Sequence, residues 1–186
     1  AFADILNSTT TVTCKDVTIV DALSDNIEIY DTDNNNIYDA QDDSNLTVLK
    51  KLVKVLKINN STNKTESLTP YDISFDSESS VLTVSLGADS TANPDYTYKV
   101  TYPIVASNTA KDDFAKKGEN AYKGTADPDT GTYAEQSGFF TNVKADSEFD
   151  SGTYVSYQKV DEKGNPVGVT QHLAYPMPVI CGARLT

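Results

Sequence analysis

The residues best suited to chemistry in this sequence form an oxygen-rich stretch at 31–42. Its spacing matches a calcium-binding loop, in which side-chain oxygens recur at fixed positions and one backbone carbonyl completes the set. The matching residues are Asp31, Asp33, Asn35, Ile37 (through its carbonyl), Asp39 and Asp42. Asn36 replaces the usual glycine and Asp42 the usual glutamate, which lowers the expected affinity. The stretch therefore predicts a Ca²⁺ site, and the alternative is a solvated polar turn between strands.

No combination of nucleophile, acid and base stands out elsewhere. His172 is the sole histidine, so a zinc site of several histidines is excluded and a Ser-His-Asp triad would have to use this residue. No Gly-x-Ser-x-Gly turn accompanies it, and spacing singles out no carboxylate pair for glycoside hydrolysis. We therefore expect His172 to be a core or surface strand residue, and we expect a protein that is not an enzyme.

The net charge of −12 restricts the partners. Asp and Glu outnumber Lys and Arg 27 to 15, and nucleic acid is bound by neutralising its phosphates with basic side chains, so nucleic acid is not expected. No apolar run approaches the ~18–20 residues that cross a bilayer, so we expect no membrane span in this fragment. One basic cluster exists, formed by Lys50, Lys51, Lys54 and Lys57. It could dock a partner or a neighbouring domain, but an exposed strand edge protected by lysines is the simpler interpretation.

The composition favours strands in one domain over residues 1–186. Thr, Ser and Val are abundant, there are 11 tyrosines and no tryptophan, and branched or aromatic side chains pack well on a pleated sheet. The pattern predicts turns at 21–25, 59–65, 76–80 and 161–166, and strands at 5–20, 27–30, 73–75, 81–86, 96–105, 139–143, 153–160 and 167–179. We expect an all-β sandwich with long surface loops. The abrupt start at residues 1–7 allows for a missing upstream strand.

Two segments carry a helical signal. At 47–58, Leu49, Leu52 and Leu56 fit a helical face, whereas the Val and Ile content favours a strand, and we predict a strand. At 110–117 we predict a short helix that begins after Ser107 or Thr109 and ends at Gly118.

Five segments in order resemble the Ig-like domains of Gram-positive cell-wall-anchored adhesins and pilus tip proteins. They cover roughly residues 16–180. The segments are DVTIVDALSD at 16–25, YTYKVTY at 96–102, the short helix at 110–118, GTY with SGFFTN at 131–142, and YPMPVI at 175–180. The resemblance implies a collagen-adhesin-type Ig-like β-sandwich.

The function that the resemblance implies is structural. Such a domain serves as a covalently stabilised stalk or scaffold of an extracellular, cell-wall-attached surface protein that supports adhesion to a host or to cells. Its partners would be neighbouring domains of the same protein, and its anchor would lie outside this fragment. The alternative is a module that itself binds a ligand, for instance a host glycan or matrix protein in a Ca²⁺-dependent manner.

The resemblance also implies a cross-link between the first and last strands. Taken alone, Cys14 and Cys181 could be buried thiols or a disulfide. Related domains often carry an isopeptide bond from an early lysine, promoted by a buried acid, and Lys15 and Asp21 match these two roles. Residues 174–183 contain no Asn or Asp acceptor. We therefore expect a Cys14–Cys181 disulfide instead, worth up to about 5 kcal/mol on the loop-entropy model.

Overall fold

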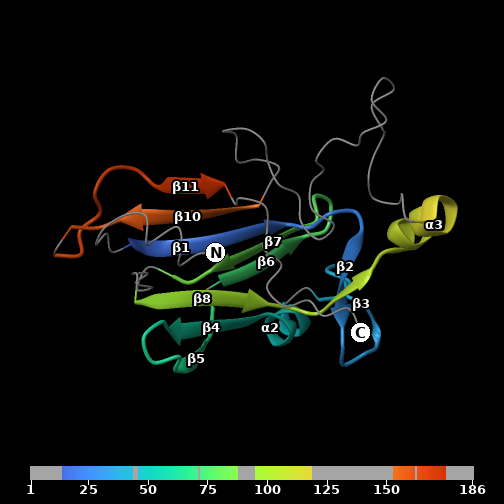
Figure 1. The fold of residues 1–186 in the computed structure, drawn as a ribbon, viewed down its shortest axis with the longest axis horizontal. Coiled ribbons are helices and arrows are strands. Elements are labelled where there is room, and N and C mark those ends of the chain that lie inside the picture. Colours follow the sequence, from blue (N-terminus) through green and yellow to red (C-terminus); the bar gives the residue numbers. More distant parts are fainter. Residues whose placement is uncertain are drawn as a thin grey trace, which may run out of the picture.

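Antiparallel strands are the main regular structure of the residues that the structure describes. The computed structural model describes residues 14–43, 46–70, 72–87, 95–118, 153–161 and 163–174, and the statements below refer to these residues. Their strands form one five-stranded and two three-stranded sheets (Figure 1), which confirms the all-β class. Among these residues, no helix has the length and apolar character needed to cross a membrane.

β1 occupies the centre of the five-stranded sheet. The order is β11-β10-β1-β7-β6, with strands at Gln171–Ala174, Tyr154–Lys159, Cys14–Ala22, Val81–Ser85 and Asp72–Asp76. β1 is thus hydrogen-bonded on both sides. A bulge lies between Lys15 and Thr18, where Asp16 adopts a φ of 52°. The extra residue turns both Cys14 and Val17 toward the same buried cluster.

Two smaller sheets of three strands each complete the described fold. One sheet has the order β3-β2-β9, with strands at Asn36–Ile37, Ile27–Asp31 and Ile104–Ala106. The other has the order β5-β4-β8, with strands at Thr65–Leu68, Lys54–Asn59 and Tyr96–Thr101. Helix α2 (Thr47–Leu52) leads into β4, and helix α3 (Asn108–Lys117) follows β9.

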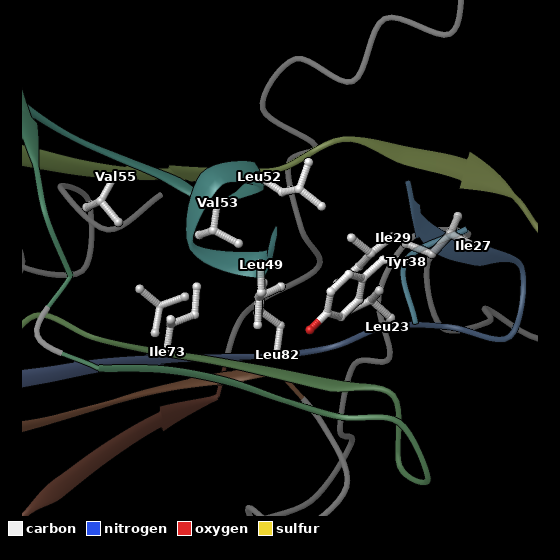
Figure 2. Close-up of a cluster of buried hydrophobic side chains, with 11 residues drawn as sticks. Leu23, Ile27, Ile29, Tyr38, Leu49, Leu52, Val53, Val55, Ile73 and Leu82 are labelled. Atoms are coloured by element: carbon white, nitrogen blue, oxygen red, sulfur yellow. The ribbon is translucent and has the colours of Figure 1, made fainter. Parts of the chain in front are cut away.

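The main core joins all three sheets to α2. Figure 2 shows Leu49 and Leu52 of α2 on one side, Ile73 and Leu82 of the large sheet below, and Ile29 of β2 beside them. The full set of buried members is Leu23, Ile27, Ile29, Tyr38, Leu49, Leu52, Val53, Val55, Ile73, Leu82 and Val84. A second buried cluster joins Cys14, Val17 and Val155 of the large sheet to Tyr98 of β8. The large sheet therefore packs on the β5-β4-β8 sheet as two facing β layers.

Several local predictions are confirmed. The strand predicted at 5–20 is confirmed over its described part, β1, where Val17 and Ile19 both pack in the second cluster. β6 and β7 pair across the turn at 77–80, and turns lie at 60–62 and 163–164. Helix α3 begins after Ser107, whose side chain accepts a hydrogen bond from the Ala110 N–H, and it ends at Gly118 with a φ of 56°.

Two predicted strands were wrong. Segment 47–58 is helix α2 followed by β4, because Leu49 and Leu52 are both needed in the core and helical spacing brings them to one side. Segment 96–105 is not one strand: β8 ends at Thr101 and β9 begins at Ile104 in another sheet. Pro103 separates them, and proline has no N–H for a ladder.

The ends of the large sheet bear on the proposed pairing of first and last strands. β1 does not pair with β11, the last described strand. On the side of β1 opposite β7 its neighbour is β10, and β11 pairs with the far side of β10. The predicted partner segment at 175–181 and the predicted strand at 139–143 lie outside the described residues, as do the GTY and SGFFTN motifs.

Candidate functional site

A single carboxylate joins three distant parts of the chain. Asp21 Oδ2 accepts a 2.6 Å hydrogen bond from the Tyr102 hydroxyl, and Asp21 Oδ1 accepts one of 3.1 Å from the Thr153 hydroxyl. Thr153 Oγ1 in turn accepts the Ala22 N–H at 3.0 Å. We name Asp21, Tyr102 and Thr153 the Asp21 junction. It ties β1 to the residue before β10 and to the link between β8 and β9.

Tyr102 acts in this junction as a neutral donor. It reaches Asp21 from the point where the chain leaves β8 for β9. Burial, followed by the charge of Asp21 and the hydrogen bond to it, raises the pKa of Tyr102 well above its ordinary value of 10.0. The phenol therefore stays protonated at physiological pH. The geometry makes the junction a structural tie between strands.

A second carboxylate, that of Asp43, anchors helix α2. Its Oδ1 accepts the Thr47 N–H at 2.7 Å, and its Oδ2 accepts the Leu49 N–H at 2.9 Å and the Tyr38 hydroxyl at 3.2 Å. Burial alone would raise the pKa of Asp43, but the hydrogen bonds from these groups and from the Val48 N–H lower it overall. Burial, together with the neighbouring Asp43, raises the pKa of Tyr38 to about 12.

The predicted calcium loop contains several internal hydrogen bonds. The Asp31 side chain is buried, and its Oδ1 accepts the N–H groups of Asp33 at 3.0 Å and Asn34 at 3.2 Å. Its Oδ2 accepts the Asn34 side-chain amide at 2.7 Å. Hydrogen bonding from Asn34 is the main reason that the pKa of Asp31 is lowered. Asn35 Oδ1 accepts the Tyr30 hydroxyl at 2.6 Å, so a second predicted ligand oxygen is also engaged.

The loop conformation differs from the one that its spacing suggests. The left-handed residue is Asn35, with a φ of 57°, one position before Asn36. Asn36 and Ile37 form β3, Asp39 Oδ1 accepts the Gln41 N–H at 2.8 Å, and Asp42 is exposed. Within the described ranges, no three His, Cys, Asp or Glu side chains are grouped as metal ligands. The chemistry seen in the loop is that of a hydrogen-bonded turn, and calcium binding stays a prediction.

The predicted cross-linking residues are placed only in part. Cys14 is buried beside Val17 and Val155; burial raises the pKa of its thiol, while Lys159 lowers it. Cys181 lies outside the described residues, so the disulfide stays a prediction. Lys15 and Asp21 are six residues apart on the same strand, roughly 20 Å at strand spacing, so the structure does not bring them together.

His172 lies on a strand at the surface, which is one of the two positions expected for it. Its exposed side chain is on β11, and its ring meets that of Tyr154 edge-on with 5.6 Å between centroids.

The sequence indicated Asp21 but not the residues that donate hydrogen bonds to it. The signal for Tyr102 was the proline that follows it, which marks a change of sheet and hence a new set of neighbours.

These observations define an all-β domain of antiparallel sheets in which one partly buried carboxylate, that of Asp21, joins distant parts of the chain. Residues 14–181 match the family model DUF7604, described as a domain of unknown function. The chain therefore belongs to the DUF7604 family. No curated protein matches the sequence.

The Asp21 junction predicts a large effect of one hydroxyl group. Tyr102→Phe removes a donor from a partly buried carboxylate, so we expect a loss of about 1–3 kcal/mol in the free energy of unfolding, measured by urea denaturation. Tyr30→Phe is the matched control, because the Tyr30 hydroxyl also bonds a side chain at 2.6 Å but does so at the surface. Equal losses in the two variants would contradict a special role for the junction.

Asp43 predicts a dependence of stability on pH. Because its pKa is lowered in the fold, its contribution is present above the unfolded value of about 3.9 and is lost as pH falls through the folded value. We expect Asp43→Asn to cost about 1–2 kcal/mol at pH 7, and the gap from wild type to shrink below about pH 4. Exposed Asp42→Asn is the control. A gap that is constant in thermal melts from pH 7 to pH 2 would refute the assignment.

The cysteines predict a covalent tie that mass spectrometry detects. Under denaturing, non-reducing conditions the intact chain is expected to weigh less than the reduced chain by two hydrogen atoms, because a disulfide joins Cys14 and Cys181. Cys14→Ser removes the difference. An unchanged mass on reduction, in protein purified without reductant, would show that both cysteines remain thiols.

Proposed function

We propose that this domain is a mechanical scaffold of a Gram-positive cell-surface adhesin or pilus protein, with an Ig-like β-sandwich fold and an extracellular location. The resemblance of the motifs supports the assignment to this class of surface protein, and the two facing β layers are compatible with a β-sandwich. On this proposal its partners are the neighbouring domains of the same surface protein. The observation that carries the proposal is the direction in which β1 and β11 run through the large sheet.

β1 and β11 run parallel to each other, on either side of β10. Cys14 pairs with Lys159 at one end of β10, while Val20 pairs with Tyr154 at the other end. Tyr154 also pairs with Ala174, the last residue of β11. Cys14 and Ala174 therefore lie at opposite ends of the sheet, and the three strands can be followed side by side in Figure 1.

This arrangement is suited to resist tension. Hydrogen bonds in an antiparallel ladder are perpendicular to the strands. A force that pulls Cys14 and Ala174 apart acts along the strands, so it loads the bonds of the β1–β10 and β10–β11 ladders together. If both residues lay at one end of the sheet, the same force would open the bonds one after another.

The Asp21 junction adds a tie across the same ladder. Thr153 immediately precedes β10, and its hydroxyl bonds Asp21 of β1 at 3.1 Å. Ala22 donates its N–H to the same hydroxyl at 3.0 Å. These bonds lie at the end of β1 opposite Cys14, so they extend the β1–β10 contact beyond the last ladder pair.

Single-molecule pulling tests the proposal. The Cys14→Ser variant is used, so that no disulfide to Cys181 carries the force past the sheet. It is pulled once between its two termini and once between its N-terminus and a handle on Lys163, an exposed residue of the β10–β11 connection at the residue-14 end of the sheet. Pulling between the termini should require a roughly twofold or greater unfolding force, because the ladders are sheared and not unzipped. An equal or lower force between the termini would reject a mechanical role.

A further inference from the structure

One face of the β5-β4-β8 sheet points away from the core. Val55 and Tyr98 are buried and Val100 packs on the main core, and successive residues of a strand point to opposite faces. The residues that alternate with them therefore face outward. The register places these residues side by side: Lys54, Leu56 and Ile58 of β4, Thr65 and Ser67 of β5, and Thr97, Lys99 and Thr101 of β8. We name this set the lysine face.

The lysine face has no carboxylate, although acids outnumber bases 27 to 15 in the chain. Lys99 pairs with Leu56, so Lys54 lies diagonally from it at roughly 7–8 Å. Leu56 and Ile58 are partly exposed at the centre. Neither lysine has an ion-pair partner among the described residues. The face is positive, apolar at its centre and unmatched in charge.

Protection of a strand edge does not explain Lys54. β4 lies between β5 and β8, so it is the central strand of its sheet, and the simpler interpretation made from the sequence was wrong. Lys50 and Lys51 lie on α2 and not on a strand. Lys57 points to the other face, where its Nζ lies 4.2 Å from the ring centroid of Tyr96. Lys54 thus protects no strand edge, and Lys99 of the outer strand β8 lies diagonally from it on the same outward face.

The same chain presents a surface with the opposite character. We name residues 31–42 the acidic loop. Its Asp33, Asp39 and Asp42 are exposed, and Ile37 is 41% exposed among them. β3, which carries Ile37, is the outer strand of its sheet, so the loop projects at the edge of the molecule (Figure 1). An apolar residue surrounded by carboxylates matches an apolar centre flanked by lysines.

We propose that the lysine face binds the acidic loop of a second copy of this chain, with Ile37 packing on Leu56 and Ile58. In this contact the carboxylates of Asp33 and Asp39 face Lys54 and Lys99. Charge complementarity identifies the occupant, because the positive face and the negative loop attract each other. Two chains of net charge −12 repel each other in most other orientations. Contact between the positive face and the negative loop is an orientation in which that repulsion is offset locally, so association is weak and specific.

Charge-swapped variants test this contact by analytical ultracentrifugation at low ionic strength. Lys54→Glu with Lys99→Glu makes the face negative, and Asp33→Lys with Asp39→Lys makes the loop positive. Wild type is expected to show a concentration-dependent rise in average mass, and each double variant alone is expected to stay monomeric. Their equimolar mixture should associate again, because two contacts are then matched in charge: the reversed face of the first variant with the reversed loop of the second, and the native loop of the first with the native face of the second.

The controls separate this contact from a general effect of charge. Lys111→Glu with Lys116→Glu changes the net charge equally, but on exposed residues of α3, and should associate like wild type. Circular dichroism confirms that each variant is folded. Monomeric wild type across the accessible concentration range, a monomeric mixture of the swapped variants, or loss of association in the α3 control would each overturn the proposal.

Discussion

The carboxylate of Asp21 is the contact on which the arrangement of the sheets most depends. It lies on the central strand of the large sheet, and its two oxygens accept hydroxyl groups from residues 81 and 132 positions away. A partly buried carboxylate must find such donors, since leaving it unpaired would cost far more than either bond contributes. The segments that supply Tyr102 and Thr153 are therefore held beside β1 by the same requirement.

Other carboxylates meet a similar need closer in sequence. Asp31, Asp43, Asp76 and Asp161 each accept backbone N–H groups at a turn or at the start of a helix, and each has a lowered pKa. Short polar side chains that bond nearby backbone groups are the ordinary chemistry of turns. Part of the acidic composition thus serves to order connections between strands. Hydrogen bonding to the backbone therefore explains the many side-chain oxygens of the loop at 31–42 without a metal.

What the sequence predicted well was local. The β6–β7 hairpin follows from alternation around a polar turn, and helix α3 follows from Ser107 and Gly118 at its ends. Helix α2 was missed because the Val and Ile content of 47–58 outweighed the helical spacing of its leucines, and in a segment this short the core decides the conformation. The donors to Asp21 could not be found because nothing local in the chain indicates a partner so distant. The order of strands was beyond reach for the same reason.

Strand order also decides what the exposed residues mean. A lysine on an edge strand needs no further explanation, but Lys54 lies on the central strand of its sheet, where it protects no edge. In the same way, parallel β1 and β11 place Cys14 and Ala174 at opposite ends of the sheet, whereas adjacent antiparallel strands would place the corresponding ends together. Both the resistance to tension and the lysine face are therefore properties of topology. They arise from which strands are neighbours, and the composition of any single strand would not reveal them.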